Sequence, residues 1–467
     1  MTHFGRKDSA GERDRPGRHH WRPTDDSCGP DREVTRAWFC VRVRSPHGSS
    51  ADRQACLPGD LTGRRHRVFS SLVEWFVRLS LVCRLLCQQG LSGEEAPPVG
   101  THGLSVRDGV VMLDGKPFRG IGSNYFALFS RLLKNPEDTS SLSNLTALAK
   151  SGIPFVRFMC GGYWPAEQRL YLDKPDAFFE RLDRVVRNAE KNHIGLVPSL
   201  FWHLPTLPDL AGEPVQELGN TNSRTIALLR RYTAEVVNRY KDSPAIWAWE
   251  FGNESALGAD LPNASEHRPP VVPGLGTAKT RSSRDELSFA GLRIAYAEFA
   301  GTIRKLDPTR VIISGNALPR DSAWHNTHER SWKADTAEQF CEILRRDNPG
   351  LMNVLSVHIY RTASHPGGAR SIDDIVALVA EESEREGKPA FVGEFGVERQ
   401  TGTLEQQRAA FEELLAAFER HRVPLAAFWV FDYPAMEADW NVSFQNDRAF
   451  MIGLVARANA RIRSGAR

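Results

Sequence analysis

The chain has 467 residues, enough for one large domain or several small ones, and its 41% hydrophobic and 25% charged residues are ordinary values for a globular protein. Its 60 lysine and arginine residues nearly balance 57 aspartate and glutamate residues, and a formal charge of +3 is too small to predict nucleic-acid binding. The seven cysteines are concentrated in the first hundred residues, and their spacing predicts neither a zinc site nor a disulfide framework.

Residues 1–100 differ in composition from the rest of the chain. Up to about residue 66 they are rich in arginine, glycine, proline, aspartate and histidine, which predicts a basic, disordered region. The hydrophobic segment 68–87 follows a basic stretch and precedes small residues, the order found in a secretory signal. Three charged residues interrupt it, which argues against stable membrane insertion, and an amphipathic helix is the alternative. The signal-like interpretation predicts a secreted or cell-envelope protein.

From residue 101 to residue 467, short apolar runs alternate with amphipathic helical patterns, which predicts βαβ units and a parallel sheet. A small hairpin is expected at Val106–Leu113. The eight expected strands are Phe118–Gly122, Phe155–Phe158, Gly195–Phe201, Ala245–Gly252, Val311–Ser314, Val354–His358, Ala390–Gly393 and Ala426–Val430. Expected helices include Ser140–Ser151, Ala177–Lys191, Ser223–Tyr240 and Leu404–His421. The repeats predict a (β/α)8 TIM barrel with extended βα loops.

Two long insertions leave the expected carboxyl ends of strands, Ser255–Glu286 after the fourth strand and Asn316–Lys333 after the fifth. In a parallel barrel this end carries the active site, so both insertions are expected to border its mouth. The second insertion carries Trp324, His325 and Trp332 and is expected to shape substrate binding.

Polar side chains gather at the exits of the expected strands. The apolar run Ala245–Gly252 ends in Asn253 and Glu254, and Ala390–Gly393 is followed by Glu394. Two carboxylates at the ends of two barrel strands are the groups needed to cleave a glycosidic bond. The complete set of polar and aromatic exit residues is Asn124, Arg157, His203, Asn253, Glu254, His358, Tyr360, Glu394 and Trp429.

These residues, in this order, resemble glycoside hydrolase family 5, the cellulase and mannanase family, over roughly residues 101–460. The family places an Arg after strand two, a His after strand three, Asn-Glu after strand four, His-x-Tyr after strand six, a Glu after strand seven and a Trp after strand eight. The matching segments here are FVRFM, LFWH, WEFGNE, VHIY, VGEFG and AFWVF. The resemblance implies a (β/α)8 barrel that hydrolyses β-glycans with retention of configuration.

The resemblance assigns Glu254 as general acid/base and Glu394 as nucleophile. Their carboxyl groups are expected about 5 Å apart, the spacing of double displacement. Glu254 has to be protonated while Glu394 is ionised, and Arg157 is expected to favour the charged form of Glu394. Tyr360 is expected to donate a hydrogen bond to the same carboxylate.

The remaining matched residues are expected to support catalysis or hold the sugar. Asn253 is assigned to the sugar 2-hydroxyl, His358 to orienting Glu254, and His203 to another sugar hydroxyl. Asn124 is expected in the same supporting group. No metal and no cofactor are needed, and the two histidines lack the spacing of a paired metal site.

Aromatic side chains suit the flat apolar faces of sugars. Trp429 is expected to lie under the sugar at the cleavage point. Further candidate subsite aromatics, for which packing in the barrel lid is the alternative, are Tyr125, Tyr163, Trp164, Trp202, Phe431, Tyr433 and Trp440. Trp247 and Trp249 are instead expected between strand and helix. Glu250 is expected to point into the barrel and to need a partner such as Arg157.

The sequence therefore predicts a retaining, endo-acting hydrolase of a β-1,4-linked polysaccharide, mannan or glucan. The alternatives are a barrel that binds glycan without cutting it, and an exo-β-glycosidase or transglycosylase that uses the same residues. The Asn124-Tyr125 pair and the Trp-Glu-x-x-Asn-Glu form of the fourth strand favour the mannanase side of the family. The sequence leaves the sugar and the oligomeric state open.

Overall fold

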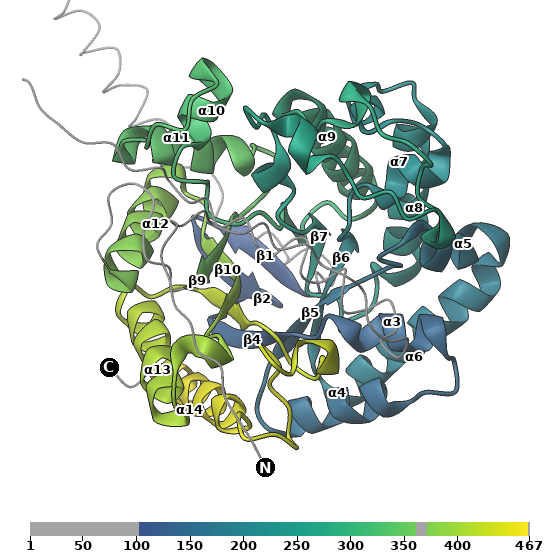
Figure 1. The fold of residues 1–467 in the computed structure, drawn as a ribbon. Coiled ribbons are helices and arrows are strands. Elements are labelled where there is room, and N and C mark those ends of the chain that lie inside the picture. Colours follow the sequence, from purple (N-terminus) through teal and green to yellow (C-terminus); the bar gives the residue numbers. More distant parts are fainter. Residues whose placement is uncertain (1–101, 361–370, 466–467) are drawn as a thin grey trace, which may run out of the picture. The chain divides into compact units, whose positions relative to one another are not determined.

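The computed structural model describes residues 102–360 and 371–465. The predictions for residues 1–100, including the signal-like segment 68–87, lie outside the described residues. Within the described part, parallel strands occupy the centre and helices surround them (Figure 1). Among these residues no helix has both the length and the apolar character required to cross a membrane.

Eight parallel strands form the barrel, in the spatial order β8-β7-β6-β5-β4-β11-β10-β9. They are β4 (Gly120–Asn124), β5 (Phe155–Met159), β6 (Gly195–Phe201), β7 (Ala248–Gly252), β8 (Val311–Ile313), β9 (Leu355–Tyr360), β10 (Ala390–Gly396) and β11 (Leu425–Phe428). At the seam between β8 and β9, the backbone N–H of Asn353 donates to the Ile312 carbonyl at 3.0 Å, and Ser356 Oγ donates to the Asn316 carbonyl at 3.2 Å. The predicted (β/α)8 barrel is confirmed.

The helices cover the outside of the barrel. They are α3 (Ala127–Lys134), α4 (Ser140–Lys150), α5 (Pro165–Asp173), α6 (Pro175–Asn192), α7 (Thr206–Ala211), α8 (Arg224–Tyr240), α9 (Phe289–Leu306), α10 (Ala323–Glu329), α11 (Ala337–Asp347), α12 (Ile372–Glu386), α13 (Leu404–Arg420) and α14 (Phe450–Ser464). Their starts follow sequence signals: Ser223 Oγ accepts from the Ile226 N–H, and Thr403 and Gln406 form a capping box. Their apolar faces pack on strands that are buried along their full length, as expected for a parallel sheet covered on both faces.

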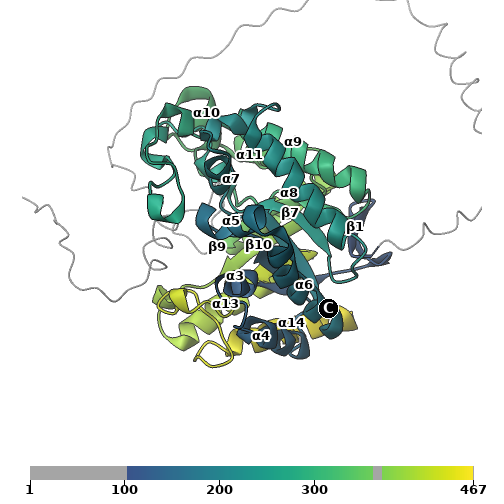
Figure 2. The same cartoon turned by 90° about the vertical axis from the view of Figure 1, so that its right-hand side faces the viewer.

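An antiparallel sheet closes the amino end of the barrel. It consists of β1 (Leu104–Arg107), β2 (Val110–Leu113) and β3 (Lys116–Pro117), and its position confirms the predicted hairpin. The Leu104 N–H donates to the Trp247 carbonyl at 2.8 Å, which ties the sheet to the start of β7. In the side view this sheet lies at one end of the barrel and α10 lies at the other (Figure 2).

The two tryptophans of the fourth predicted strand have different environments. Trp249 is buried between strand and helix, as expected, and its indole N–H donates to Asp307 at 2.8 Å. The same prediction for Trp247 was wrong. Trp247 precedes β7, and its ring lies on the barrel floor, with its centroid 5.2 Å from that of Phe118 and 5.7 Å from that of Phe155. Gly195 leaves room for this ring, because a Cβ there would approach it to 2.2 Å.

Candidate active site

Glu254 and Glu394 meet at the carboxyl end of the barrel. Glu394 lies within β10 and is buried, whereas Glu254 follows β7 and keeps 24% of its side chain exposed. One carboxylate oxygen of each, together with a ring nitrogen of His358, all lie within 4.8 Å of one another. This separation matches the close pair of carboxyl groups that double displacement requires.

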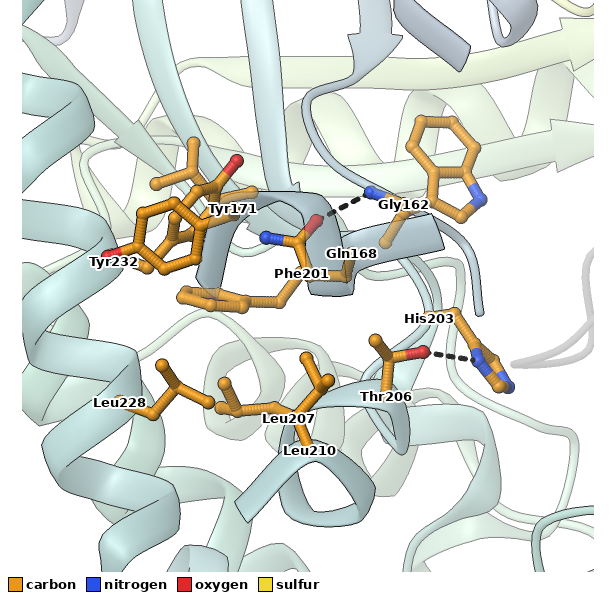
Figure 3. A pocket seen from close by; sticks show the side chains of 12 residues that line it. Gly162, Gln168, Tyr171, Phe201, His203, Thr206, Leu207, Leu210, Leu228 and Tyr232 are labelled. Carbon is orange, nitrogen blue, oxygen red and sulfur yellow. Dashed lines mark hydrogen bonds between the residues drawn. The ribbon is translucent and has the colours of Figure 1, made fainter. Parts of the chain in front are cut away.

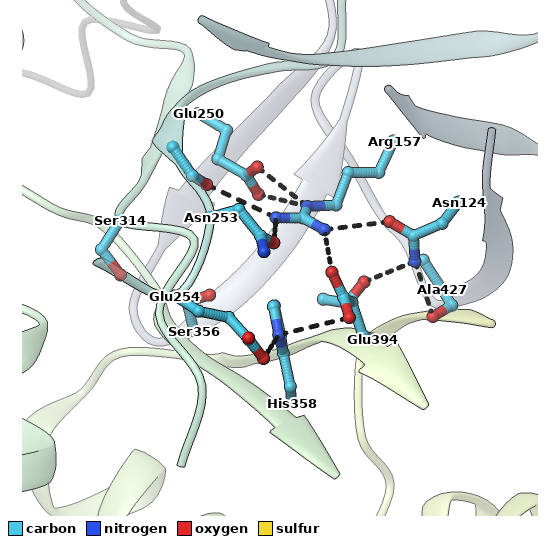
Figure 4. Close-up of polar contacts among 12 residues, drawn as sticks. Asn124, Arg157, Glu250, Asn253, Glu254, Ser314, Ser356, His358, Glu394 and Ala427 are labelled. Carbon is cyan, nitrogen blue, oxygen red and sulfur yellow. Dashed lines mark hydrogen bonds and ion pairs between the residues drawn. The ribbon is translucent and has the colours of Figure 1, made fainter. Parts of the chain in front are cut away.

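Arg157, the middle residue of β5, is the centre of the polar network (Figure 4). Its Nε donates to both oxygens of Glu250 at 2.8 Å, and its Nη1 donates to Glu394 Oε1 at 2.8 Å. The other nitrogen, Nη2, donates to Asn253 Oδ1 at 2.8 Å. Arg157, Glu250 and Glu394 are fully buried or nearly so. The predicted contacts of Arg157 with Glu250 and Glu394 are therefore both present.

Two hydrogen bonds favour the ionised form of Glu394, and burial acts against it. Burial and the nearby Glu254 carboxylate raise the pKa of Glu394, and the charged Arg157 and the Tyr360 hydrogen bond counteract that rise. Tyr360 donates its hydroxyl proton to Glu394 Oε2 at 2.6 Å, and burial raises the pKa of Tyr360 well above its ordinary value, so it remains a donor. Each oxygen of Glu394 thus accepts a hydrogen bond that favours its negative charge.

Glu254 has a different environment. Burial raises its pKa to about 7, and the more distant Arg157 charge only partly counteracts this rise. Its Oε1 lies 2.8 Å from His358 Nδ1. Burial lowers the pKa of His358 to about 4, so the imidazole is neutral at neutral pH and puts no positive charge beside Glu254. Glu254, whose pKa is raised to about 7, thus lies beside a carboxylate held by a guanidinium and a phenol, which is the arrangement required for acid and nucleophile in one site.

Asn124 supports this network from the end of β4. It is fully buried, accepts from Arg157 Nη1 at 3.0 Å through Oδ1, and donates through Nδ2 to the Gly393 carbonyl at 2.8 Å and the Ala427 carbonyl at 3.2 Å. It links β5, β10 and β11. Burial excludes direct contact with a sugar.

His203 and Trp202 leave β6 side by side but contact different groups. His203 Nδ1 lies 3.0 Å from the Tyr163 carbonyl and 3.1 Å from Thr206 Oγ1, and its ring stacks on Tyr163 with centroids 4.4 Å apart. Burial lowers the pKa of His203 to about 4, which keeps it neutral. Trp202 lies over the Arg157 guanidinium, 4.3 Å from ring centroid to carbon, and so covers one face of the charge network.

An aromatic cluster lines the same end of the barrel. Trp202 and Trp429 are stacked with centroids 6.0 Å apart, and the Trp440 ring meets Tyr360 edge-on at 5.0 Å. Phe126, which the sequence analysis did not single out, lies 5.3 Å from Trp202 and 4.9 Å from Tyr433 by ring centroids. The available signal was its position just after the exit of β4, where aromatic residues face the mouth.

Three of the candidate subsite aromatics serve packing. Tyr125 is fully buried and donates to Asp432 Oδ2 at 2.6 Å, and Phe431, also fully buried, meets its ring edge-on at 5.0 Å. Neither ring has surface left for a sugar, so the packing alternative holds for both. Trp164 meets the His203 ring edge-on at 5.3 Å, which favours the lid-packing alternative for it.

A small cavity lies between β6 and the helices α5, α7 and α8 (Figure 3), and His203 and Trp202 are among its lining residues. Leu207, Gln168 and Tyr232 are among its lining residues. Its volume of about 20 Å³ has room for about one water molecule and none for a sugar.

Among the described residues, Glu254, His358 and Glu394 form one group with the spacing of a metal site. The donors around them do not suit a cation. Both oxygens of Glu394 already accept hydrogen bonds, and the permanently charged Arg157 lies 2.8 Å from one of them. The set therefore fits an acid–nucleophile pair better than a divalent ion.

Comparison with known proteins gives one consistent family. The family described as "Cellulase (glycosyl hydrolase family 5)" matches residues 113–433. Mannan endo-1,4-beta-mannosidase F of Aspergillus fumigatus is 30% identical over 179 residues, which are 34% of this chain and 40% of that protein. Mannan endo-1,4-beta-mannosidase A of Podospora anserina is 38% identical over 85 residues, 16% of this chain and 21% of that protein. The matched regions thus span well under half of these curated relatives.

Solved structures show the same fold. The endo-1,4-beta-mannanase of Rhizomucor miehei aligns with a TM-score of 0.55 and 20% identity, over 77% of this chain and 99% of that one. The endo-beta-1,4-mannanase of Thermotoga petrophila aligns with a TM-score of 0.53 and 16% identity, over 76% of this chain and 79% of that one.

Proposed function

The chain belongs to glycosyl hydrolase family 5, and from this premise we propose that it cleaves a β-1,4-linked polysaccharide within the chain and with retention of configuration. The observation that carries the proposal is the carboxyl pair. Glu394 is held by a guanidinium and a phenol, while Glu254, whose pKa burial raises to about 7, lies within reach of it.

In the first step Glu254 gives its proton to the glycosidic oxygen while a Glu394 oxygen attacks the anomeric carbon. The carbon–oxygen bond to the leaving sugar breaks, and an ester to Glu394 forms. In the second step the Glu254 carboxylate takes a proton from water, the water oxygen attacks the anomeric carbon, and the ester bond breaks. Both side chains then return to their starting protonation states.

The neighbouring residues take roles that follow from their contacts. Arg157 and Tyr360 orient the Glu394 carboxylate and leave its lone pairs directed at the anomeric carbon. Neutral His358 fixes Glu254. Asn253, oriented by Arg157 Nη2, is assigned to the sugar 2-hydroxyl, whose hydrogen bond strengthens in the transition state. Trp429 supplies the apolar platform beneath the sugar.

Mannan is the preferred substrate in this proposal, and β-1,4-glucan is second. The support is the set of relatives and structural neighbours, which are named as endo-acting mannanases. The proposal includes a secreted or cell-envelope location, for which the support is the signal-like order of residues predicted at segment 68–87.

The test is reducing-sugar release from mannan, glucomannan, carboxymethylcellulose, xylan and mixed-linkage β-glucan, with wild type beside Glu254→Ala and Glu394→Ala. We expect release from mannan that both substitutions abolish, with a fast fall in viscosity that marks internal cleavage. Binding of a polymer without release from any of them would favour a non-catalytic glycan-binding barrel. Activity that survives Glu394→Ala would contradict the mechanism.

A further inference from the structure

Glu254 has a backbone conformation that its neighbours must hold in place. Its φ of +49° and ψ of +24° lie in the left-handed region, which side chains other than glycine rarely adopt. Such a residue keeps this conformation only where surrounding contacts fix it. The contacts come from the segment that follows β8: the Glu254 N–H donates to the Gly315 carbonyl at 2.8 Å, and the Ala256 N–H donates to Asn316 Oδ1 at 3.1 Å.

Directly after Glu254 the chain makes a 3-10 helix, η2 (Ser255–Gly258). The backbone carbonyl oxygens of this turn carry partial negative charge, which favours a cation. Arg320, from the insertion after β8, supplies that cation. Its guanidinium donates to the carbonyls of Ala256 at 3.0 Å, Leu257, and Ala259 at 3.0 Å.

The other contacts of Arg320 do not compete with its hydrogen bonds to these backbone carbonyls. Its Nε donates to Asn326 Oδ1 at 3.0 Å on α10, so the four acceptors of its hydrogen bonds in the described structure are neutral oxygens. Burial lowers the pKa of Arg320 to about 10, which leaves it charged at neutral pH. The planar fork of a guanidinium can engage several carbonyls at once, whereas a lysine ammonium acts as a point charge.

We propose that Arg320 is a positioning residue for Glu254, a role that rests on the proposed function. By holding the end of η2, Arg320 fixes the turn that starts at Glu254 and thereby keeps the carboxyl group 2.8 Å from His358 and facing Glu394. The insertion after β8 thus acts on proton transfer through its arginine, in addition to bordering the mouth of the barrel.

The test compares Arg320→Met with Arg330→Met. Arg330 belongs to the same insertion and also donates to a loop carbonyl, that of Pro262 at 2.8 Å, but this carbonyl lies eight residues beyond Glu254. Two substrates are used, mannohexaose, whose leaving sugar needs a proton, and 2,4-dinitrophenyl β-mannobioside, whose leaving phenolate needs none. Glucose-based counterparts replace them if the polymer panel identifies a glucan.

A misplaced acid slows only the reaction that requires a proton. We expect Arg320→Met to lower kcat on mannohexaose by ~10- to 100-fold and the glycosyl-enzyme formation rate on the dinitrophenyl substrate by less than ~3-fold. Arg330→Met changes either rate by less than ~3-fold. Equal losses on both substrates, or no loss on either, would overturn the proposal, because a merely structural arginine does not distinguish leaving groups.

Two controls separate this inference from its premise. If circular dichroism shows that Arg320→Met does not fold, Arg320→Lys replaces it in the test. This variant retains the positive charge but loses the forked guanidinium. Its rate on mannohexaose is again expected to fall more than its rate on the dinitrophenyl substrate, by a smaller factor than for Arg320→Met. Wild type that cleaves neither substrate, or Glu254→Ala that keeps full activity on mannohexaose, contradicts the proposed function itself. Normal behaviour of both, with Arg320→Met equal to Arg330→Met, overturns the role of Arg320 alone.

Discussion

At the amino end of the barrel the inward-facing residues of β5 and β7 are Phe155 and Ala248, whereas two positions further along the same strands they are Arg157 and Glu250. Successive residues on one face of a strand are about 7 Å apart, so the interior changes from apolar floor to buried charge within that distance. The floor is stabilised by burial of apolar surface. The charged layer, which consists of Arg157, Glu250 and Glu394, has to offset the cost of removing these three ionisable groups from water.

The two ends of the barrel therefore have different roles: the apolar floor stabilises the fold, and the charged layer carries out the chemistry. Substitutions in the floor are expected to change the free energy of unfolding and leave the rate per folded molecule intact. Substitutions in the charged layer are expected to change the rate, its pH dependence, or both.

The largest expected effect is in the charged layer. Glu394→Ala removes the group that forms the ester, and we expect kcat on polymer to fall by ~10⁴-fold or more. Added azide can enter the space left by the carboxylate, so the variant is expected to regain activity and to give a glycosyl azide of inverted configuration. Steady-state rates and product NMR check this. Regained activity with a retained product would contradict the assignment.

In the floor, Trp247→Ala removes a ring packed between Phe118, Phe155 and the backbone at Gly195. We expect a loss of about 3–5 kcal/mol in the free energy of unfolding, measured by urea denaturation. The value of kcat, measured well below the unfolding midpoint, is expected to stay within about twofold of wild type because the floor is separated from the reacting groups by the charged layer. A fall in kcat comparable with that of Glu394→Ala would contradict the conclusion that the floor affects stability and the charged layer affects the rate.

The pH dependence of the wild-type rate tests the protonation states of the carboxyl groups at the active site. Glu254 must be protonated in the first step, and its pKa of about 7 means that the acid form is lost as the pH rises through 7. On mannohexaose we expect kcat/KM to fall by about tenfold per pH unit above 7. On the dinitrophenyl substrate this alkaline limb is expected to be absent, since no proton is needed. An alkaline limb of equal size on both substrates would assign it to another group.

Glu250→Gln sharpens the comparison within the charged layer. Glu250 shares the Arg157 charge with Glu394, while His358, Tyr360 and Glu254 also face Glu394. Without the Glu250 charge, Arg157 favours the ionised form of Glu394 more strongly, so the pKa of Glu394 falls. The acid limb of kcat/KM is then expected to move to lower pH by about one unit. An unchanged acid limb would show that Glu250 only anchors the guanidinium.

The smallest expected effect is at Tyr125. Tyr125→Phe removes the hydrogen bond to Asp432 but keeps the ring against Phe431. Asp432 retains Arg131 Nη1 and Asn144 Nδ2, each at 2.7 Å, so we expect a loss of about 1 kcal/mol in stability and no change in KM. A rise in KM without a loss of stability would return Tyr125 to the substrate site.

The barrel and its polar exits could be predicted because both depend on short-range patterns. Gly195–Phe201 was predicted to the residue, and the inward direction of Glu250 followed from the alternation of side chains along a strand. The convergence of Arg157, Glu254 and Glu394 on one face followed from the parallel arrangement.

Errors arose where a shift of one residue along a strand changes which side of the sheet a side chain faces. The first strand was placed at Phe118–Gly122, but it runs to Asn124, so Asn124 faces inward and Tyr125 faces the surrounding helices. Trp247 was grouped with Trp249 as a residue of the same strand, yet it precedes β7 and its ring lies beneath the barrel. The contacts of Arg320 join two irregular insertions, and neither has a periodicity from which a contact can be predicted.

The central claim is that Glu394 forms a covalent ester while Glu254 transfers protons, and trapping that ester tests it most directly. A 2-deoxy-2-fluoro mannoside with a dinitrophenolate leaving group slows both steps and the second one more, so the ester accumulates. We predict one added fluorosugar by intact mass, located by peptide sequencing on the peptide that carries Glu394, and no label in Glu394→Ala. Label on a different carboxylate, or turnover of a natural oligosaccharide to a product of inverted configuration with no ester formed, would contradict the account.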